Sequence, residues 1–197
     1  AKGVRKSTSK LAGGIELFSE SDIQYIKGKG EMHTLASTRI STNYGAIVNS
    51  LESSNAAFEI LAATDKVTEH TDDLRYYDLL SSCLAAINSG LSPKLIIGYF
   101  YVNLLNMTGH TIDISGDVEG NSFNETFGYQ YNFDRGGFER DNYGYRSSVI
   151  KLIKLMSMLK PGPLGKITGA ELELEESVRL LRRMVEYYLQ IKPVGSK

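Results

Sequence analysis

The side chains best suited to covalent or metal chemistry are few and far apart in this sequence. The three histidines, His33, His70 and His110, lie in different segments, without HExxH or comparable ligand spacing. The single cysteine, Cys83, lies in the apolar run LLSSCLAAI with no neighbouring histidine, which excludes an intramolecular disulfide and favours a core position. Neither a G-x-S-x-G elbow nor a phosphate-binding loop occurs. The sequence therefore predicts a protein that is not an enzyme and that has no metal site and no cofactor.

Basic side chains give the chemical signal that does stand out. Four of them lie in the first ten residues among Gly, Ser and Thr, and three more follow near a predicted hairpin turn: Lys2, Arg5, Lys6, Lys10, Lys27, Lys29 and Arg39. Ammonium and guanidinium groups beside hydroxyls and backbone N–H groups bind phosphate oxygens, so these seven residues are candidate nucleic-acid-binding residues. A basic run is also typical of an ordinary solvated surface, and composition alone leaves both interpretations open.

A second basic cluster lies in the last predicted helix, where Arg179, Arg182 and Arg183 have i, i+3, i+4 spacing and share one face. Two interpretations are open for these arginines. They could bind a partner protein, or they could form salt bridges with the nearby acids Glu175, Glu176 and Glu186. From spacing alone we favour the salt bridges.

The charge is distributed unevenly along the 197 residues, although the net charge is only −1. Residues 1–45 carry +3, residues 46–146 carry −8 and residues 147–197 carry +4. The 42% hydrophobic and 23% charged composition is that of a soluble globular protein and excludes a disordered chain. No apolar run reaches the roughly 20 residues of a membrane span, and no leader segment is recognisable, so we expect a cytoplasmic protein.

Hydrophobic periodicity divides the chain into two parts. Residues 1–45 are predicted to form short strands at 15–18, 23–26 and 32–36, with a turn at Gly28–Gly30, which suits a small antiparallel barrel or part of one. From about residue 44 the pattern becomes helical. Further helices are predicted after the Thr71–Asp73 cap signal, from Ser92-Pro93 to Met107 as the buried centre of a bundle, from Ser147 to Leu159, and after the capping-box spacing of Thr168–Glu171. Alternating aromatics at 127–133 predict a packed hairpin inserted among the helices.

Four motifs in order carry a family resemblance. The opening AKGVRK, followed by Ser7–Lys10 and the apolar segment Leu11–Phe18, resembles the signature of the bacterial DNA repair protein RecO family. The segment GKGEMHTL from Gly28 resembles that family's GRGE…TL hairpin, and YQYNFDRGGF from Tyr129 resembles its aromatic–GGF element. The last helix followed by KPVGSK resembles the family's closing motif, so the resemblance covers essentially the whole chain.

The resemblance implies an α+β fold, with a partial OB-fold β-barrel that binds DNA over residues 1–43. A mainly helical domain would follow over 44–197, with the inserted β-hairpin at about 122–140. It further implies a non-enzymatic recombination mediator that binds single- and double-stranded DNA, anneals complementary strands and, with RecR, helps load RecA onto DNA coated by single-stranded DNA-binding protein (SSB). The acidic, hydrophobic C-terminal tail of SSB would dock in an apolar groove of the helical domain, with Arg179, Arg182 and Arg183 as candidates for its rim. No membrane partner is implied, and the location would be the bacterial cytoplasm, with the nucleoid.

Two departures from the family pattern lead to further expectations. The family's first barrel strands, which precede the AKG segment, are not found in this sequence, so we expect a barrel that cannot close. Many members also have a four-cysteine zinc site around the aromatic hairpin, whereas this chain has no cysteine there. We therefore expect a zinc-free hairpin held by Phe and Tyr packing. The alternative function is a protein–protein adaptor that has a degenerate barrel and does not bind DNA.

Overall fold

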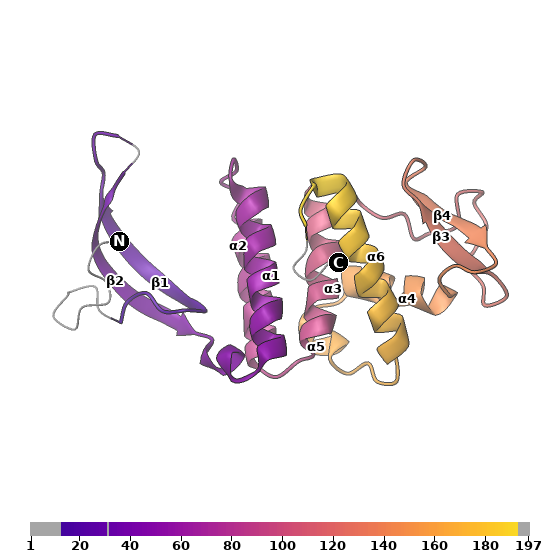
Figure 1. Cartoon of the computed structure of the whole chain (residues 1–197), viewed down its shortest axis with the longest axis horizontal. Helices are drawn as coiled ribbons and strands as arrows, with labels where there is room; N and C mark the ends of the chain where they lie inside the picture. The colour runs from indigo at the N-terminus through magenta and orange to yellow at the C-terminus, as the bar shows by residue number, and fades with distance from the viewer. Residues whose placement is uncertain (1–12, 31, 193–197) are drawn as a thin grey trace. The chain divides into compact units, whose positions relative to one another are not determined.

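The computed structural model describes residues 13–30 and 32–192 (Figure 1). The chain forms two compact units, one ending at Ser50 and the other beginning at Leu51. Four of the predicted DNA-binding residues, Lys2, Arg5, Lys6 and Lys10, lie outside the described residues.

The first unit is a two-stranded antiparallel ribbon followed by a short 3-10 helix. Strand β1, Ser19–Ile26, pairs with β2, Thr34–Asn43, and the register shifts twice along the ribbon. The 3-10 helix η1, Gly45–Asn49, follows β2. The turn predicted around Gly28–Gly30 is confirmed, since the connection between the strands runs from 27 to 33. The described residues of this unit form a single β-ribbon, so the expected OB-fold is not confirmed.

The strand predicted at 15–18 is wrong, and a local hydrogen-bond pattern explains the error. The Ser19 hydroxyl donates to the Glu16 carbonyl at 2.7 Å, and Phe18 has a left-handed φ of 51°. This turn takes the chain out of extended geometry immediately before β1. Strand β1 therefore begins at Ser19, between the strands predicted at 15–18 and 23–26, and continues through the second of them.

The second unit is mainly helical, as predicted. Its first three helices are α1, Leu51–Thr68, α2, Arg75–Asn88, and α3, Pro93–Met107. Helix α1 begins later than the pattern at residue 44 suggested, because η1 and Ser50 precede it. The Ser92 hydroxyl accepts a hydrogen bond from Leu95 N at 3.4 Å, and Pro93 occupies the first turn, so the predicted start of α3 is confirmed.

Helix α3 is the buried centre of this unit, which confirms the prediction made from its all-round apolar sequence. Nine of its fifteen residues are buried. It packs against α1, α2, α4 and α6. Gly98 lies where a Cβ would come within 2.8 Å of Met156 Sδ, so the absence of a side chain lets α4 approach α3 closely.

A β-hairpin and three helices complete the second unit. The hairpin consists of β3, Gly128–Asn132, and β4, Gly137–Asp141, and it lies beyond α4 and α6, at the opposite end of this unit from α1 and α2 (Figure 1). The helices are α4, Ser147–Met158, the single turn α5, Pro161–Leu164, and α6, Glu171–Leu189. The predicted capping box at Thr168–Glu171 is wrong. Gly169 has a φ of 73°, and α6 begins at Glu171 after Ala170, without a side-chain cap.

Candidate functional site

The β1–β2 connection carries two of the predicted DNA-binding residues at an exposed position. Lys27 and Lys29 are both solvent-exposed in this loop. At its base the rings of Tyr25 and His33 stack, with centroids 5.2 Å apart and planes within 3°. Both rings are themselves exposed, so the ribbon presents ammonium groups next to flat π-surfaces. Such a combination can contact phosphates and stack on unpaired bases.

The charges on the described residues of the first unit sum to zero. Arg39 lies directly opposite Asp22 in the strand register. The described residues up to Ser50 include three basic and three acidic side chains. The basic residues are Lys27, Lys29 and Arg39, and the acidic residues are Glu16, Glu20 and Asp22. The +3 charge of residues 1–45 therefore comes from the first ten residues, whose four basic side chains outweigh the additional acid Glu31. An electrostatic attraction for DNA would depend mainly on that N-terminal segment.

Arg182 has a structural partner that the sequence did not suggest. Its Nε and Nη2 atoms donate to Oε1 and Oε2 of Glu59, both at 2.8 Å, and the Tyr101 hydroxyl donates to the same Oε1 at 2.8 Å. The Glu59 side chain is only 4% exposed. Hydrogen bonding to Glu59 raises the pKa of Arg182 above its usual value. The network joins α1, α3 and α6, and it corrects the expected pairing of Arg182 with Glu175, Glu176 or Glu186.

The other two arginines of the cluster remain at the surface. Arg179 and Arg183 are exposed, and the Arg183 guanidinium lies 5.6 Å from the centroid of the Phe133 ring. The half-exposed Tyr187 ring is 4.7 Å from Phe133. We call Arg179, Arg183, Phe133 and Tyr187 the α6 surface patch, in which the Arg183 guanidinium lies near the Phe133 ring and Arg179 is exposed one turn earlier on the same helix. Arg182 thus pairs with a buried carboxylate, whereas Arg179 and Arg183 stay at the surface, although all three share a helix face.

Aromatic packing holds the hairpin to the rest of the unit, as expected from the sequence. Tyr129, Tyr131 and Phe138 are buried, and Phe123 packs edge-on against two of them. Tyr131 and Tyr188 share a hydrogen bond of 3.1 Å between their hydroxyls, which ties the hairpin to α6. The prediction of a packed hairpin from the alternating aromatics is therefore confirmed.

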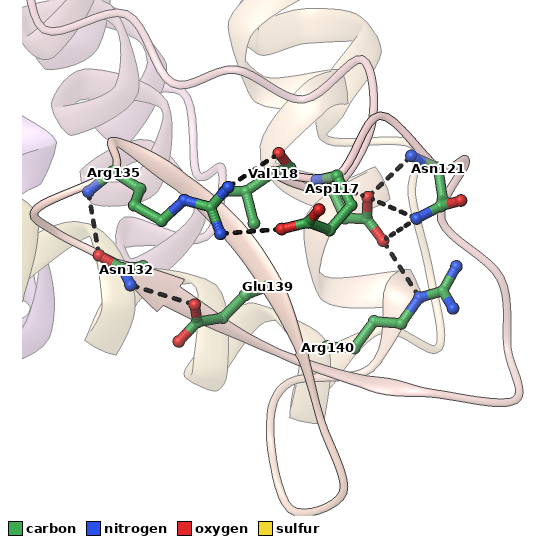
Figure 2. Close-up of polar contacts among 8 residues, drawn as sticks. Asp117, Val118, Asn121, Asn132, Arg135, Glu139 and Arg140 are labelled. Carbon is green, nitrogen blue, oxygen red and sulfur yellow. Dashed lines mark hydrogen bonds and ion pairs between the residues drawn. The ribbon is translucent and has the colours of Figure 1, made fainter.

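A compact polar cluster joins the segment at 117–121 to the hairpin, both at its turn and near the end of β4, and the sequence-based predictions missed it. The buried Asp117 carboxylate accepts hydrogen bonds from Asn121 N at 2.7 Å, from Asn121 Nδ2 at 3.1 Å and from Arg140 Nε at 3.1 Å (Figure 2). Arg135 bridges Glu119 and the Val118 carbonyl on the other side of the same loop (Figure 2). The available signal was the DVEGN segment, whose Asp and Gly favour a turn.

Asp117 is charged in the folded protein at neutral pH. Burial acts to raise the pKa of its carboxyl. Hydrogen bonds from the backbone and side-chain N–H groups of Asn121 and from the Glu119 backbone N–H, together with the Arg140 charge, outweigh that effect and leave the pKa below its usual value. The Arg140 guanidinium also lies over the Phe127 ring, 4.5 Å from its centroid. Asp117 and Arg140 thus link the loop, β4 and the segment before β3.

Among residues 13–30 and 32–192, no group of three or more His, Cys, Asp or Glu side chains is arranged to hold a metal ion. Cys83 is fully buried in α2, and burial raises the pKa of its thiol to about 12. A nucleophilic cysteine needs the opposite shift, so this thiol is a core group. In the described part of the chain, no helix is both long and apolar enough to cross a membrane.

The helical unit with its aromatic hairpin defines the class of protein to which the chain is related. Residues 50–197 match the family described as "Recombination protein O C terminal". Since this match covers more than half of the sequence, the chain belongs to the recombination protein O family.

Curated relatives are consistent with this family membership at low identity. The chain is 33% identical to "DNA repair protein RecO" of Dehalococcoides mccartyi over 56% of this chain and 44% of that protein. It is 25% identical to the protein of the same name from Listeria innocua, over 95% of this chain and 74% of that protein. The figures for Roseiflexus sp. are 24%, 98% and 71%. The chain therefore spans less than half the length of the D. mccartyi relative and about three quarters of the other two.

Proposed function

We propose that this protein acts in DNA repair as a recombination mediator and catalyses no covalent reaction. It binds single- and double-stranded DNA, anneals complementary strands and, together with RecR, helps load RecA onto SSB-coated DNA in the bacterial cytoplasm. The observation that carries this proposal is the match of residues 50–197 to the recombination protein O family.

DNA binding in this proposal rests on phosphate neutralisation by the N-terminal segment and the β1–β2 loop. Lys2, Arg5, Lys6 and Lys10 supply the excess charge, and the exposed Lys27 and Lys29 extend it along the ribbon. Arg39 contributes less, because Asp22 lies opposite it. Such a surface has little base specificity and strong salt dependence. Screening the phosphates of two strands together lowers the repulsion that slows annealing.

The test compares single-strand binding across a range of salt concentrations. Replacing the four N-terminal cations with Gln is expected to reduce the slope of log K against log salt by about 3, since each neutralised phosphate contributes about 0.7. Lys66→Gln is the matched control, because Lys66 is an exposed lysine of α1 paired with Glu69. An unchanged affinity and slope in the quadruple variant would contradict the assignment. If the wild-type chain is not retained on single-stranded DNA even at low salt, the adaptor function is favoured instead.

The SSB tail is the second partner in this proposal, and we place it on the α6 surface patch. An acidic, hydrophobic peptide complements the patch because the exposed Arg183 lies near the Phe133 ring, which packs against Tyr187. The exposed Arg179, one helical turn earlier, adds a second positive charge. Arg182 is not part of this docking surface, since its Nε and Nη2 atoms both donate to Glu59.

Titration of a fluorescent SSB-tail peptide tests this placement. The double variant Arg179→Gln/Arg183→Gln is expected to weaken binding by about tenfold, the equivalent of losing one charge-assisted contact. Lys154→Gln on α4 is the control, because it removes an exposed cation outside the patch. Equal affinities for the double variant and the wild type would refute the placement and leave the DNA-binding proposal intact.

A further inference from the structure

The end of the β1–β2 ribbon that lies away from η1 exposes two aromatic rings (Figure 1). Tyr25 is 58% exposed, and His33, just before β2, is exposed as well. The last five residues of β1 are all exposed, so both faces of the ribbon meet solvent at this end. The Tyr25 ring therefore lies outside any core that the described residues form.

The two rings lie parallel to each other without being buried. Their centroids are 5.2 Å apart and their planes are within 3°, which is the offset stack that aromatic pairs prefer. The connection that places them closes tightly, because a Cβ on Gly28 would lie only 2.2 Å from Met32 O. This backbone approach brings the residues before β2 back beside the end of β1. A flat π-surface wider than one ring is thus arranged before any ligand binds, which lowers the entropic cost of binding.

The two faces of the ribbon differ in charge near these rings. Asp22 is an odd number of positions from Tyr25 in β1, so the two side chains lie on opposite faces of the strand. On its own face Asp22 is opposite Arg39 in the register. Tyr25 shares its face with the apolar Ile23, which is 55% exposed. A DNA strand that contacts the Tyr25 face therefore avoids the Asp22 carboxylate.

Two cations follow the rings within the connection. Lys27 and Lys29 are exposed, and neither forms an ion pair with another described residue. Their flexible ammonium groups suit phosphates of any strand, paired or unpaired, so they do not distinguish a single strand from a duplex. An aromatic ring does distinguish them, because an unpaired base offers a face for stacking and a base inside a duplex does not.

We propose that the stacked pair Tyr25 and His33 is a platform for an unpaired base of a DNA strand. Lys27 and Lys29 hold the phosphates next to that base. This inference rests on the proposed DNA binding and adds to it the residues that favour a single strand over a duplex. Stacking uses the face of the base, which every base has, so the platform requires no particular sequence.

Binding of the full chain to three oligonucleotides of equal length, measured by fluorescence anisotropy at one salt concentration, tests the platform. They are a single strand without self-complementarity, a strand with the same phosphates but abasic sites in place of its bases, and the duplex. The wild type should bind the normal strand about tenfold more tightly than the abasic strand, because only stacking differs between them. Tyr25→Leu should lose most of this preference, while its affinities for the abasic strand and the duplex stay those of the wild type.

Two control variants separate stacking from a structural role of the ring. Tyr25→Phe keeps a ring and should keep the preference, and Tyr143→Leu, which removes a 98% exposed tyrosine outside the ribbon, should change none of the three affinities. Equal wild-type affinities for the normal and abasic strands, or a full preference in Tyr25→Leu, would overturn the inference and leave phosphate binding intact. Equal losses for all three oligonucleotides in Tyr25→Leu would also overturn it, because they indicate a damaged ribbon. Absence of any binding by the wild type would overturn the proposed DNA binding as well.

Discussion

The Glu59–Arg182–Tyr101 network provides the sharpest test of how the helical unit is held together. Glu59 is almost completely buried on α1, and the two parallel hydrogen bonds from Arg182 on α6 are its only charged contacts among the described residues. Replacing Arg182 with Met keeps the aliphatic stem but leaves the carboxylate uncompensated. We therefore expect Arg182→Met to lower the free energy of unfolding by about 3–5 kcal/mol. That loss is a large fraction of the roughly 5–15 kcal/mol typical of a folded domain.

The double variant Glu59→Gln/Arg182→Met separates loss of the pair from burial of a lone charge. Gln removes the charge at position 59 while its Oε1 can still accept from the Tyr101 hydroxyl, which lies 2.8 Å from Glu59 Oε1 in the wild type. The double variant should therefore recover most of the stability lost in Arg182→Met, because replacing both partners of a buried pair is often nearly neutral.

Urea unfolding of the full chain, followed by circular dichroism, measures these differences. Arg179→Met is the matched control, because Arg179 lies on the same helix face but is exposed, and we expect it to change stability by less than about 0.5 kcal/mol. The reasoning is refuted if Arg182→Met is as stable as this control, or if the double variant is no more stable than Arg182→Met.

Three further predictions concern the hairpin and α2. Gly144→Ala should lower the free energy of unfolding by about 1–3 kcal/mol, because the new Cβ would overlap the Tyr129 backbone. Gly162→Ala is the control and should not lower it, because a Cβ at that position has no neighbouring atom within 4 Å. Urea unfolding compares the two variants. Because the pKa of Asp117 is lowered in the folded state, its contribution to stability is present above its unfolded pKa of about 4 and is lost as pH falls through the lower folded value. The wild type should therefore be more stable than Asp117→Asn at pH 7, and the difference should shrink steadily below about pH 4; a constant difference would contradict this. Cys83, whose pKa is about 12, should react with a thiol reagent at pH 8 only after unfolding, as absorbance of the released product would show.

Local sequence patterns were sufficient to predict most of the second unit. Ser92-Pro93 marked the start of α3, and the all-round apolar run that follows marked it as buried, because caps and periodicity act within a few residues. The alternating aromatics around Tyr129 predicted the hairpin and its packed interior for the same reason. The errors at Ile15–Phe18 and at Thr168 arose where a single left-handed residue, Phe18 or Gly169, redirected the chain.

The different environments of the three α6 arginines depend on contacts that sequence spacing does not encode. Arg179, Arg182 and Arg183 are equivalent by helical periodicity, yet Arg182 binds a carboxylate 123 residues away while the other two stay exposed. Glu59 gave one signal, as an acid between apolar residues on the buried face of α1, but not its partner. The sequence by itself determined the helices, the hairpin and the uneven charge, because these follow from neighbouring residues. Only the tertiary structure decided which charges are paired in the interior and which face solvent, because that depends on which helix faces meet.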